Sequence, residues 1–146
     1  MTPSYSLKQV VIARESWHFW NGLLPAKMLT AAWVANEDGE TSFNARPGDH
    51  GHAGGAFQWW GPRRQIILDN TGIDVWTAPH LKQLESAHWE ASESREYGHV
   101  WFLLLAQKTL EGAVGVLVND FEKSNDRASD IEKRTIMGQY WLRRFG

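Results

Sequence analysis

The sequence contains no cysteine, no long apolar run and no long basic run. Without cysteine the chain has no disulfides, no thiol nucleophile and no thiolate metal ligand, and it is indifferent to the redox state of its compartment. No segment approaches the ~20 apolar residues of a membrane span, so we expect no membrane insertion. The net charge of -2 argues against a protein that grips phosphate backbones, so we expect no nucleic-acid partner.

The first nine residues lack the features of a secretory signal. They have neither a basic start nor an apolar stretch of signal-peptide length. If the protein acts outside a cytoplasm, we expect something else to deliver it.

The 146 residues suit one domain, 1–146, with a core large enough to need no metal or disulfide. Apolar periodicity, capping patterns such as Ser6-Leu7-Lys8-Gln9 and Ser129-Asp130-Ile131-Glu132, and Gly and Pro punctuation predict helices. A loop or small hairpin is expected from 41 to 61, because Gly48, Gly51, Gly54 and Gly55 interrupt that segment. The fold class is therefore all-α with a very small β or loop insert, and helices are predicted at 7–20, 26–36, 62–68, 77–91, 99–108, 110–121 and 129–144, with 99–108 as the central buried one.

Nine tryptophans are the most unusual feature of the composition. Indoles fill cores, and they also form flat platforms for sugar rings and bases. We expect most of them in the core and two or three in a site. Trp59 and Trp60 are the best candidates for a split, because neighbours on an extended segment point to opposite sides.

Three carboxylates, Glu37, Asp38 and Glu40, end the second expected helix and precede the glycine-rich loop. One interpretation is a solvated helix end. The other is chemical: the negative end of the helix dipole, the neighbouring acids and desolvation by tryptophans would all raise the pKa of a carboxyl group here. A carboxylic acid that keeps its proton near neutral pH is what glycosidic cleavage requires.

The pattern Asn36-x-x-x-Glu40-Thr41-x-Phe43-Asn44, followed by Gly54-Gly55-Ala56-Phe57-Gln58-Trp59 and Arg63, resembles a known family. It is similar to the phage tail lysozymes of the lysozyme-like superfamily, where Asn-x-x-x-Glu-Ser-x-Phe-Asn-Pro precedes Gly-x-x-Gln-Trp. Phe121-Glu122 also resembles a motif found late in that family. The resemblance spans most of the chain.

This resemblance implies a helical lysozyme-type fold that cleaves the MurNAc-GlcNAc glycan strands of bacterial peptidoglycan. Glu40 takes the place of the general acid, and Gln58 and Trp59 take places beside the substrate. No metal or organic cofactor is expected. The sequence departs from the family at Gly39, which loosens the helix before the glutamate, at Thr41 in place of serine, and at Ala45 in place of proline.

A second catalytic acid is predicted at Asp49 on the glycine loop, with Asp38 as the alternative. Hydrolysis with inversion needs such a carboxylate to activate water. Lysozyme-like enzymes that act with one glutamate use internal attack by the muramyl hydroxyl instead, which gives an anhydro product. In that case Asp49 is a turn residue before Gly51.

Further substrate contacts are expected around these residues. Arg63 and Arg64 either contact acidic groups of the wall or are solvated. Glu122 and Tyr97 border the cleft, or Glu122 pairs with Arg127 or Lys123. The predicted substrate-binding set is Gln58, Trp59, Phe57, Trp60, Arg63, His52 and Glu122.

Three alternatives remain open at this level. The histidines offer possible zinc ligands for a cell-wall peptidase or amidase, although no His-Glu-x-x-His occurs. The possible zinc ligands are Asp49, His50, His52, His80, His88 and His99. The other two alternatives are a noncatalytic glycan-binding module and a structural phage part.

The expected partner is peptidoglycan, together with other phage lysis or tail proteins. We expect the protein either in the host cytoplasm, with delivery to the wall or periplasm, or in the virion.

Overall fold

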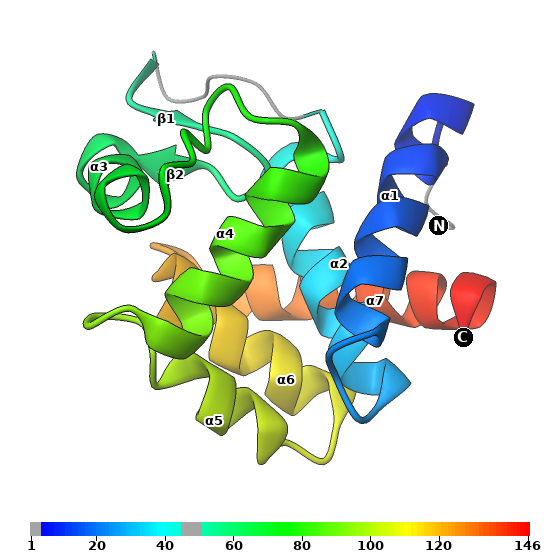
Figure 1. Cartoon of the computed structure of the whole chain (residues 1–146). Helices are drawn as coiled ribbons and strands as arrows, with labels where there is room; N and C mark the ends of the chain where they lie inside the picture. The colour runs from blue at the N-terminus through cyan, green and yellow to red at the C-terminus, as the bar shows by residue number, and fades with distance from the viewer. Residues whose placement is uncertain (1–3, 45–50) are drawn as a thin grey trace.

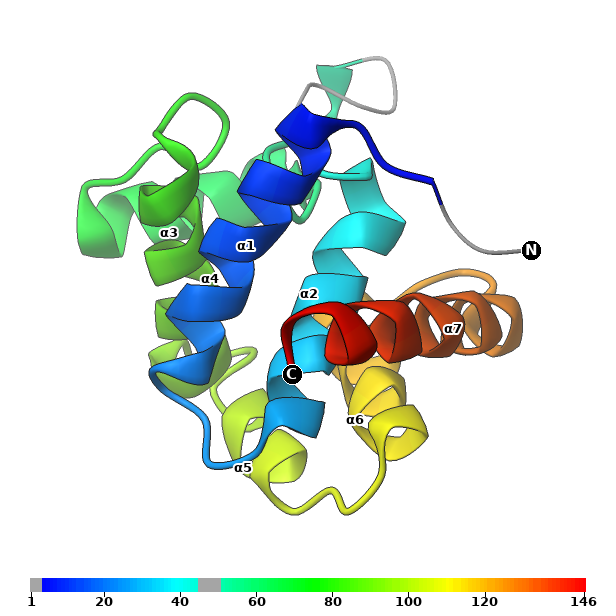
Figure 2. The ribbon, with the colours of Figure 1, turned by 90° about the vertical axis from the view of Figure 1, so that its right-hand side faces the viewer.

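Helix α2 (Lys27–Thr41) is the centre of the molecule. The computed structural model describes residues 4–44 and 51–146. Eleven residues of α2 are buried, as its content of Ala, Leu and Trp predicts. Helix α1 (Leu7–Asn21) packs on one side of α2, and α7 (Arg127–Phe145) crosses it on another (Figures 1 and 2).

The remaining elements cover α2 in two groups. One group is the antiparallel pair β1 (Ala53–Gly54) and β2 (Trp59–Trp60) with α3 (Gly61–Thr71) and α4 (His80–Glu93). The other is α5 (Val100–Leu105), α6 (Leu110–Val116) and the π-helix η2 (Leu117–Glu122). Figure 1 shows α3 and the hairpin above the loop that leads from η2 to α7. The described residues thus form seven α-helices, one π-helical turn and a two-stranded sheet, which confirms the all-α class with a very small β insert.

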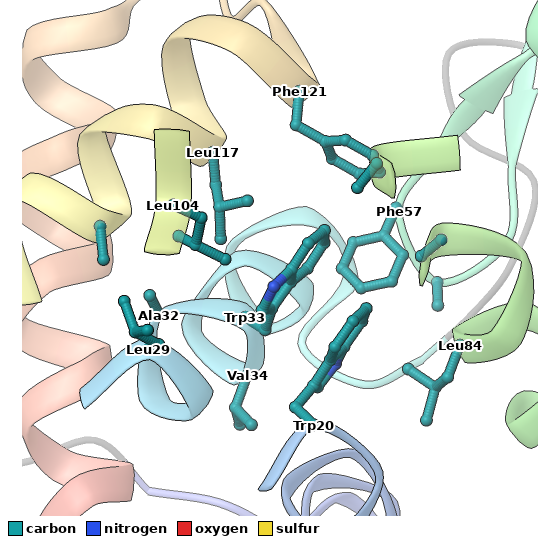
Figure 3. Packing of buried hydrophobic residues seen from close by; sticks show 14 of the residues in the cluster. Trp20, Leu29, Ala32, Trp33, Val34, Phe57, Leu84, Leu104, Leu117 and Phe121 are labelled. Carbon is teal, nitrogen blue, oxygen red and sulfur yellow. The ribbon is translucent and has the colours of Figure 1, made fainter. Parts of the chain in front are cut away.

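Trp33 on α2 connects the two groups through the core (Figure 3). Its ring stacks on Trp20 with centroids 4.0 Å apart and meets Phe57 and Phe121 edge to face. Phe57 precedes β2, and Phe121 lies in η2. These contacts therefore set the hairpin at a defined place relative to the end of η2.

Several predicted boundaries are corrected. The capping box of Ser6 and Gln9 is present and starts α1 as predicted. Helix α2 does not end at Gly39 but continues to Thr41, and Ser42 closes it in the left-handed conformation. Helix α7 begins at Arg127 rather than at 129, so Ser129 and Glu132 lie inside the helix and do not form the predicted capping box.

The prediction of a central buried helix at 99–108 is wrong. Helix α5 has only six residues and lies at the surface, where Val100 and Leu104 are buried and Phe102 is 72% exposed. A run apolar on every side does not by itself distinguish a central helix from a short one with an exposed face. No helix in the described ranges is long and apolar enough to cross a membrane.

Candidate active site

A cavity of about 670 Å³ lies between the two groups of elements. Glu40 at the end of α2 forms one part of its wall, and Gln58, Trp60 and Arg63 from the hairpin and α3 form another. Glu122 at the end of η2 closes it from the opposite group, together with residues of α7. The walls also include Ala53, Pro62, Glu96, Tyr97, Lys123, Ser124, Asn125, Asp130 and Arg134.

The three carboxylates of α2 point in three directions, because successive helical residues are about 100° apart. Glu37 is buried and bonded to Nε2 of His80 at 2.6 Å. Asp38 is buried and accepts hydrogen bonds from Tyr5 and from Nε1 of Trp141. Glu40 alone of the three reaches the cavity. The alternative of Asp38 as a second catalytic acid is therefore corrected, because its carboxylate is bonded to Tyr5, ahead of α1, and to Trp141 of α7.

Burial raises the pKa of the Asp38 carboxyl, and its hydrogen bonds with Tyr5 and Trp141 oppose that rise. Burial also raises the pKa of Glu122, and the charge of the adjacent Glu40 adds to the effect. The rise in carboxyl pKa expected at the end of α2 is therefore found at Asp38, and Glu122 at the end of η2 shows a second one.

His80 joins three helices, because its two ring nitrogens meet Glu37 of α2 and Glu15 of α1, each at 2.6 Å. Burial alone would lower the pKa of His80, but the hydrogen bonds and charges of Glu37 and Glu15 outweigh it and raise the pKa above 6.5. A histidine whose pKa is higher in the folded state than in the unfolded state stabilises the fold. The contribution is complete below the pKa of the unfolded state, and it is lost as the pH rises through the pKa of the folded state.

We therefore expect the free energy of unfolding of the native protein to fall as the pH rises above about 6.5. The part of this decrease that His80 contributes should be missing in His80→Gln. Urea denaturation between pH 6 and pH 9 measures this difference. The exposed His99→Gln serves as the control and should keep the pH dependence of the native protein. A parallel pH dependence in native protein and His80→Gln would contradict the prediction.

Glu40 and Glu122 form a network with Asn36 and Arg134. Asn36 Nδ2 donates to Glu122 Oε1 at 2.7 Å. One guanidinium nitrogen of Arg134 donates to Asn36 Oδ1 at 2.6 Å, and the other donates to Glu40 Oε1 at 3.2 Å. The side chains of Glu122 and Glu40 are themselves in hydrogen-bonding contact.

Gly39 allows Arg134 to take this place. A Cβ at position 39 would lie 2.8 Å from Cδ and 2.9 Å from Cγ of Arg134, and closer still to its Nε. Glycine is therefore required where the arginine crosses α2. The glycine before Glu40 thus has a packing role, since the missing side chain makes room for a residue that binds Glu40.

The hairpin presents Gln58 and Trp60 to the cavity. Gln58 has a positive φ of 51°, an uncommon conformation for a residue with a side chain, and its Nε2 donates to the Gly55 carbonyl at 3.0 Å. Trp59 is fully buried and Trp60 is 60% exposed, which confirms the predicted split of the pair. Of the nine tryptophans, all within the described residues, Trp60 is the one that lines the cavity.

Trp59 and Phe57 are corrected from substrate contacts to core residues, since both have no exposed surface. Nε1 of Trp59 donates to Glu90 at 3.1 Å. His52 is exposed but does not line the cavity. Asp49 and His50 lie outside the described residues.

Arg63 lines the cavity but is held in the protein rather than solvated. It makes a two-point ion pair with Glu90, donates to the Phe121 carbonyl at 3.0 Å and stacks on Tyr97 at 4.1 Å. It thereby ties α3 to α4 and to η2. Arg64 instead pairs with Asp74 outside the cavity.

Sequence reasoning missed Asn36 as a contact of Glu122, and it missed Arg134 altogether. Glu122 was predicted at the cleft, and it lies there, whereas Lys123 pairs with Glu96 and Arg127 bonds the Ser124 carbonyl. Asn36 precedes Glu40 by four residues and therefore shares its face of the helix, which was an available signal. Arg134 had no signal in the sequence, because it sits mid-helix 94 residues away from Glu40.

Among residues 4–44 and 51–146, no three His, Asp or Glu side chains are grouped so that they could hold a metal ion. His80, one of the possible zinc ligands, is bonded through both ring nitrogens to Glu37 and Glu15.

Comparison with known proteins identifies a family for the chain. The family model described as phage tail lysozyme matches residues 12–145. No curated protein and no solved structure matches the chain significantly. The matched range contains the end of α2, the hairpin and the end of η2, so it includes every part of the cavity wall described above. Because the match covers nearly the whole chain, this protein belongs to the phage tail lysozyme family.

Proposed function

We propose that this protein cleaves the glycan strand of bacterial peptidoglycan between MurNAc and GlcNAc, with Glu40 as the general acid. The observation that carries the proposal is the position of Glu40. It is the one acid of the α2 end that opens into the 670 Å³ cavity, while a second carboxyl group, Glu122, touches it. Membership of a lysozyme family makes peptidoglycan the substrate class.

The cavity suits an extended chain of sugars. It is polar and open, and its walls combine charged groups with the exposed indole of Trp60. Sugar rings offer both hydroxyl groups for hydrogen bonding and a face that packs on an aromatic ring. Gln58 presents its amide from the same hairpin.

In the proposed reaction Glu40 gives its proton to the oxygen that joins the two sugars, and the bond from that oxygen to the anomeric carbon breaks. Either water or the C6 hydroxyl of the same muramyl residue then attacks the anomeric carbon. The attacking oxygen loses a proton, which the Glu40 carboxylate accepts when the attack is internal. In inverting hydrolysis a second carboxylate accepts the proton of the attacking water instead, and Asp49 is the residue predicted for that role.

The test is mass spectrometry of the soluble products released from purified peptidoglycan. Reducing muropeptides would identify a lysozyme, and 1,6-anhydro products would identify a lytic transglycosylase. Both outcomes support glycan cleavage. Peptide fragments that disappear with EDTA would overturn it in favour of a metal-dependent peptidase or amidase. Saturable binding without release of fragments would overturn it in favour of a noncatalytic binding module.

Trp60 provides a separate test of the substrate. In a Glu40→Gln background, which prevents turnover, Trp60→Ala is expected to weaken binding of soluble glycan strands about fivefold, since one aromatic contact contributes roughly 1 kcal/mol. Calorimetry or fluorescence titration measures the dissociation constant. Phe102→Ala is the matched control, because Phe102 is an exposed aromatic residue outside the cavity. Equal affinities for the two variants would contradict a substrate contact at Trp60.

The proposed role also suggests where the protein acts. A wall-degrading enzyme of a phage works either at lysis, delivered to the wall from the host cytoplasm, or in the virion during entry. Other phage lysis or tail proteins are its proposed partners.

A further inference from the structure

Two carboxyl groups share one wall of the cavity and touch each other. Glu40 ends α2 and Glu122 ends η2, 82 residues later in the chain, and their side chains are in hydrogen-bonding contact. Two carboxylates in hydrogen-bonding contact repel each other strongly when both are ionised, and this repulsion favours one proton shared by the pair.

The surrounding donors indicate which carboxyl group carries that proton. Arginine has only donors, so the amide of Asn36 must turn its oxygen to Arg134 and its NH₂ group to Glu122. Asn36 therefore donates to one oxygen of Glu122, and Arg134 donates to Glu40. Arg134 thus bonds Glu40 directly but reaches Glu122 only through Asn36, and the pKa that burial raises is that of Glu122, so we assign the proton to Glu122.

The charges that face the pair agree with this assignment. Burial raises the pKa of Glu122 most, the charge of Glu40 raises it further, and the charges of Arg63 and Arg134 lower it only in part. The other titratable side chains at the cavity wall are Glu96, Tyr97, Lys123 and Asp130. Lys123 and Glu96 neutralise each other at 3.1 Å, and Asp130 lies 3.9 Å from Arg134.

The short separation also excludes the usual second-acid roles for Glu122. A base that activates water for inversion stands about 6.5–9.5 Å from the general acid, and a nucleophile stands about 5–5.5 Å away, because a sugar ring must fit between the two. Glu122 contacts Glu40 directly, which leaves no room for a sugar ring between the two carboxyl groups. It acts on the reaction through Glu40.

We propose that Glu122 is the proton store of the active site, which carries the catalytic proton in the free protein and passes it to Glu40 when glycan binds. The inference rests on the proposed function. The O–H bond of Glu122 breaks as an O–H bond forms on Glu40, so charge moves from Glu40 to Glu122 and no other reactant is needed. The hydrogen bond from Asn36 and the charges of Arg134 and Arg63 stabilise the new carboxylate of Glu122. Glu40 then donates the same proton to the glycosidic oxygen. Glu122 is thus a positioning residue for the proton.

The first test is the pH profile of peptidoglycan cleavage by Glu122→Gln. Glutamine keeps the acceptor for Asn36 and a donor for Glu40, but it cannot store a proton. We expect near-native rates at the acid end of the profile, within about threefold, and a high-pH limb displaced downward by at least one pH unit. Glu122→Asp retains a carboxyl group, so its high-pH limb should lie between those of Glu122→Gln and the native protein. Glu132→Gln, an equal charge change at an exposed position of α7, should leave the profile unchanged.

A superimposable profile for Glu122→Gln would overturn the inference. So would an equal loss of rate at every pH, because that pattern indicates structural support without proton storage. The direction of the displacement matters as well, and a limb that moves to higher pH contradicts the assignment of the proton to Glu122.

The second test needs no activity. In protein labelled with ¹³C at the glutamate side-chain carboxyl carbon, one resonance should titrate well above the ordinary range of about 4–5. That resonance should be absent in Glu122→Gln, and in Glu40→Gln it should titrate at lower pH because the neighbouring charge is gone. If all glutamates of the folded protein titrate in the ordinary range, the inference about Glu122 is overturned and the proposed function is not. A raised resonance in a protein that releases no glycan fragments would overturn the proposed function while the shared proton remains.

Discussion

Glu40→Gln is expected to lower the rate of fragment release from peptidoglycan by about 10³-fold, within the range of roughly 10²–10⁴ that general acids contribute. Glutamine keeps an oxygen that accepts the hydrogen bond of Arg134, so the network of Asn36 and Arg134 should persist. It has no acidic proton for the leaving sugar oxygen. The measurement is the initial rate of soluble muropeptide release, followed by chromatography at the pH optimum of the native protein.

The folded state of the Glu40→Gln variant must be checked in the same experiment. We expect a melting temperature within a few degrees of the native value and retained binding to peptidoglycan, because Glu40 is partly exposed and contributes little to the core. Glu132→Gln controls for the change in net charge. If Glu40→Gln cleaved at the native rate, Glu40 would not be the general acid and the proposed mechanism would fail.

Gly39→Ala is expected to reduce cleavage by about 10²-fold, since small displacements of a positioned catalytic group cost about this much. The added Cβ would meet the middle of the Arg134 side chain at 2.8–2.9 Å, where rotation of the guanidinium alone does not relieve the overlap. Arg134 must then leave its place over α2, and both Asn36 and Glu40 lose a donor. The measurement is again the initial rate of muropeptide release.

Stability should respond much less than activity to Gly39→Ala. Alanine favours a helix interior over glycine by about 1 kcal/mol, which partly offsets the displaced arginine. Gly115→Ala is the matched control, because Gly115 is also helical and its added Cβ would meet only Ile131 at 3.9 Å. Native activity in Gly39→Ala would show that Arg134 is not needed where it crosses α2.

The local elements of the fold were largely predictable. Ser6 and Gln9 form their capping box, the hairpin lies in the glycine-punctuated segment, and Trp60 separates from Trp59 as an extended pair should. These features depend on neighbours within a few positions, which a sequence displays directly. The prediction failed at α5, where an apolar run forms a short surface helix, and at α7, which begins two residues before the predicted capping box.

The candidate site was predictable in its parts and not in its arrangement. Glu40, Gln58, Trp60 and Glu122 were all named from the sequence, and all four line the cavity. Their mutual contacts were not foreseen. Phe57 and Trp59 were misplaced, because motif residues beside a substrate-contacting position were taken to contact substrate themselves, whereas they form the core beneath it.

The sequence by itself determined the helical class, the acid-bearing end of α2 and the aromatic hairpin, because periodicity, capping and turn residues act over short distances along the chain. Only the tertiary structure decided which acid faces the cavity and what surrounds it. Glu122 and Arg134 reach the Glu40 region from 82 and 94 residues away, through the packing of η2 and α7 on α2 and through the space left by Gly39. Burial and charge at that meeting point determine where the proton resides, and neither exists until the helices have packed.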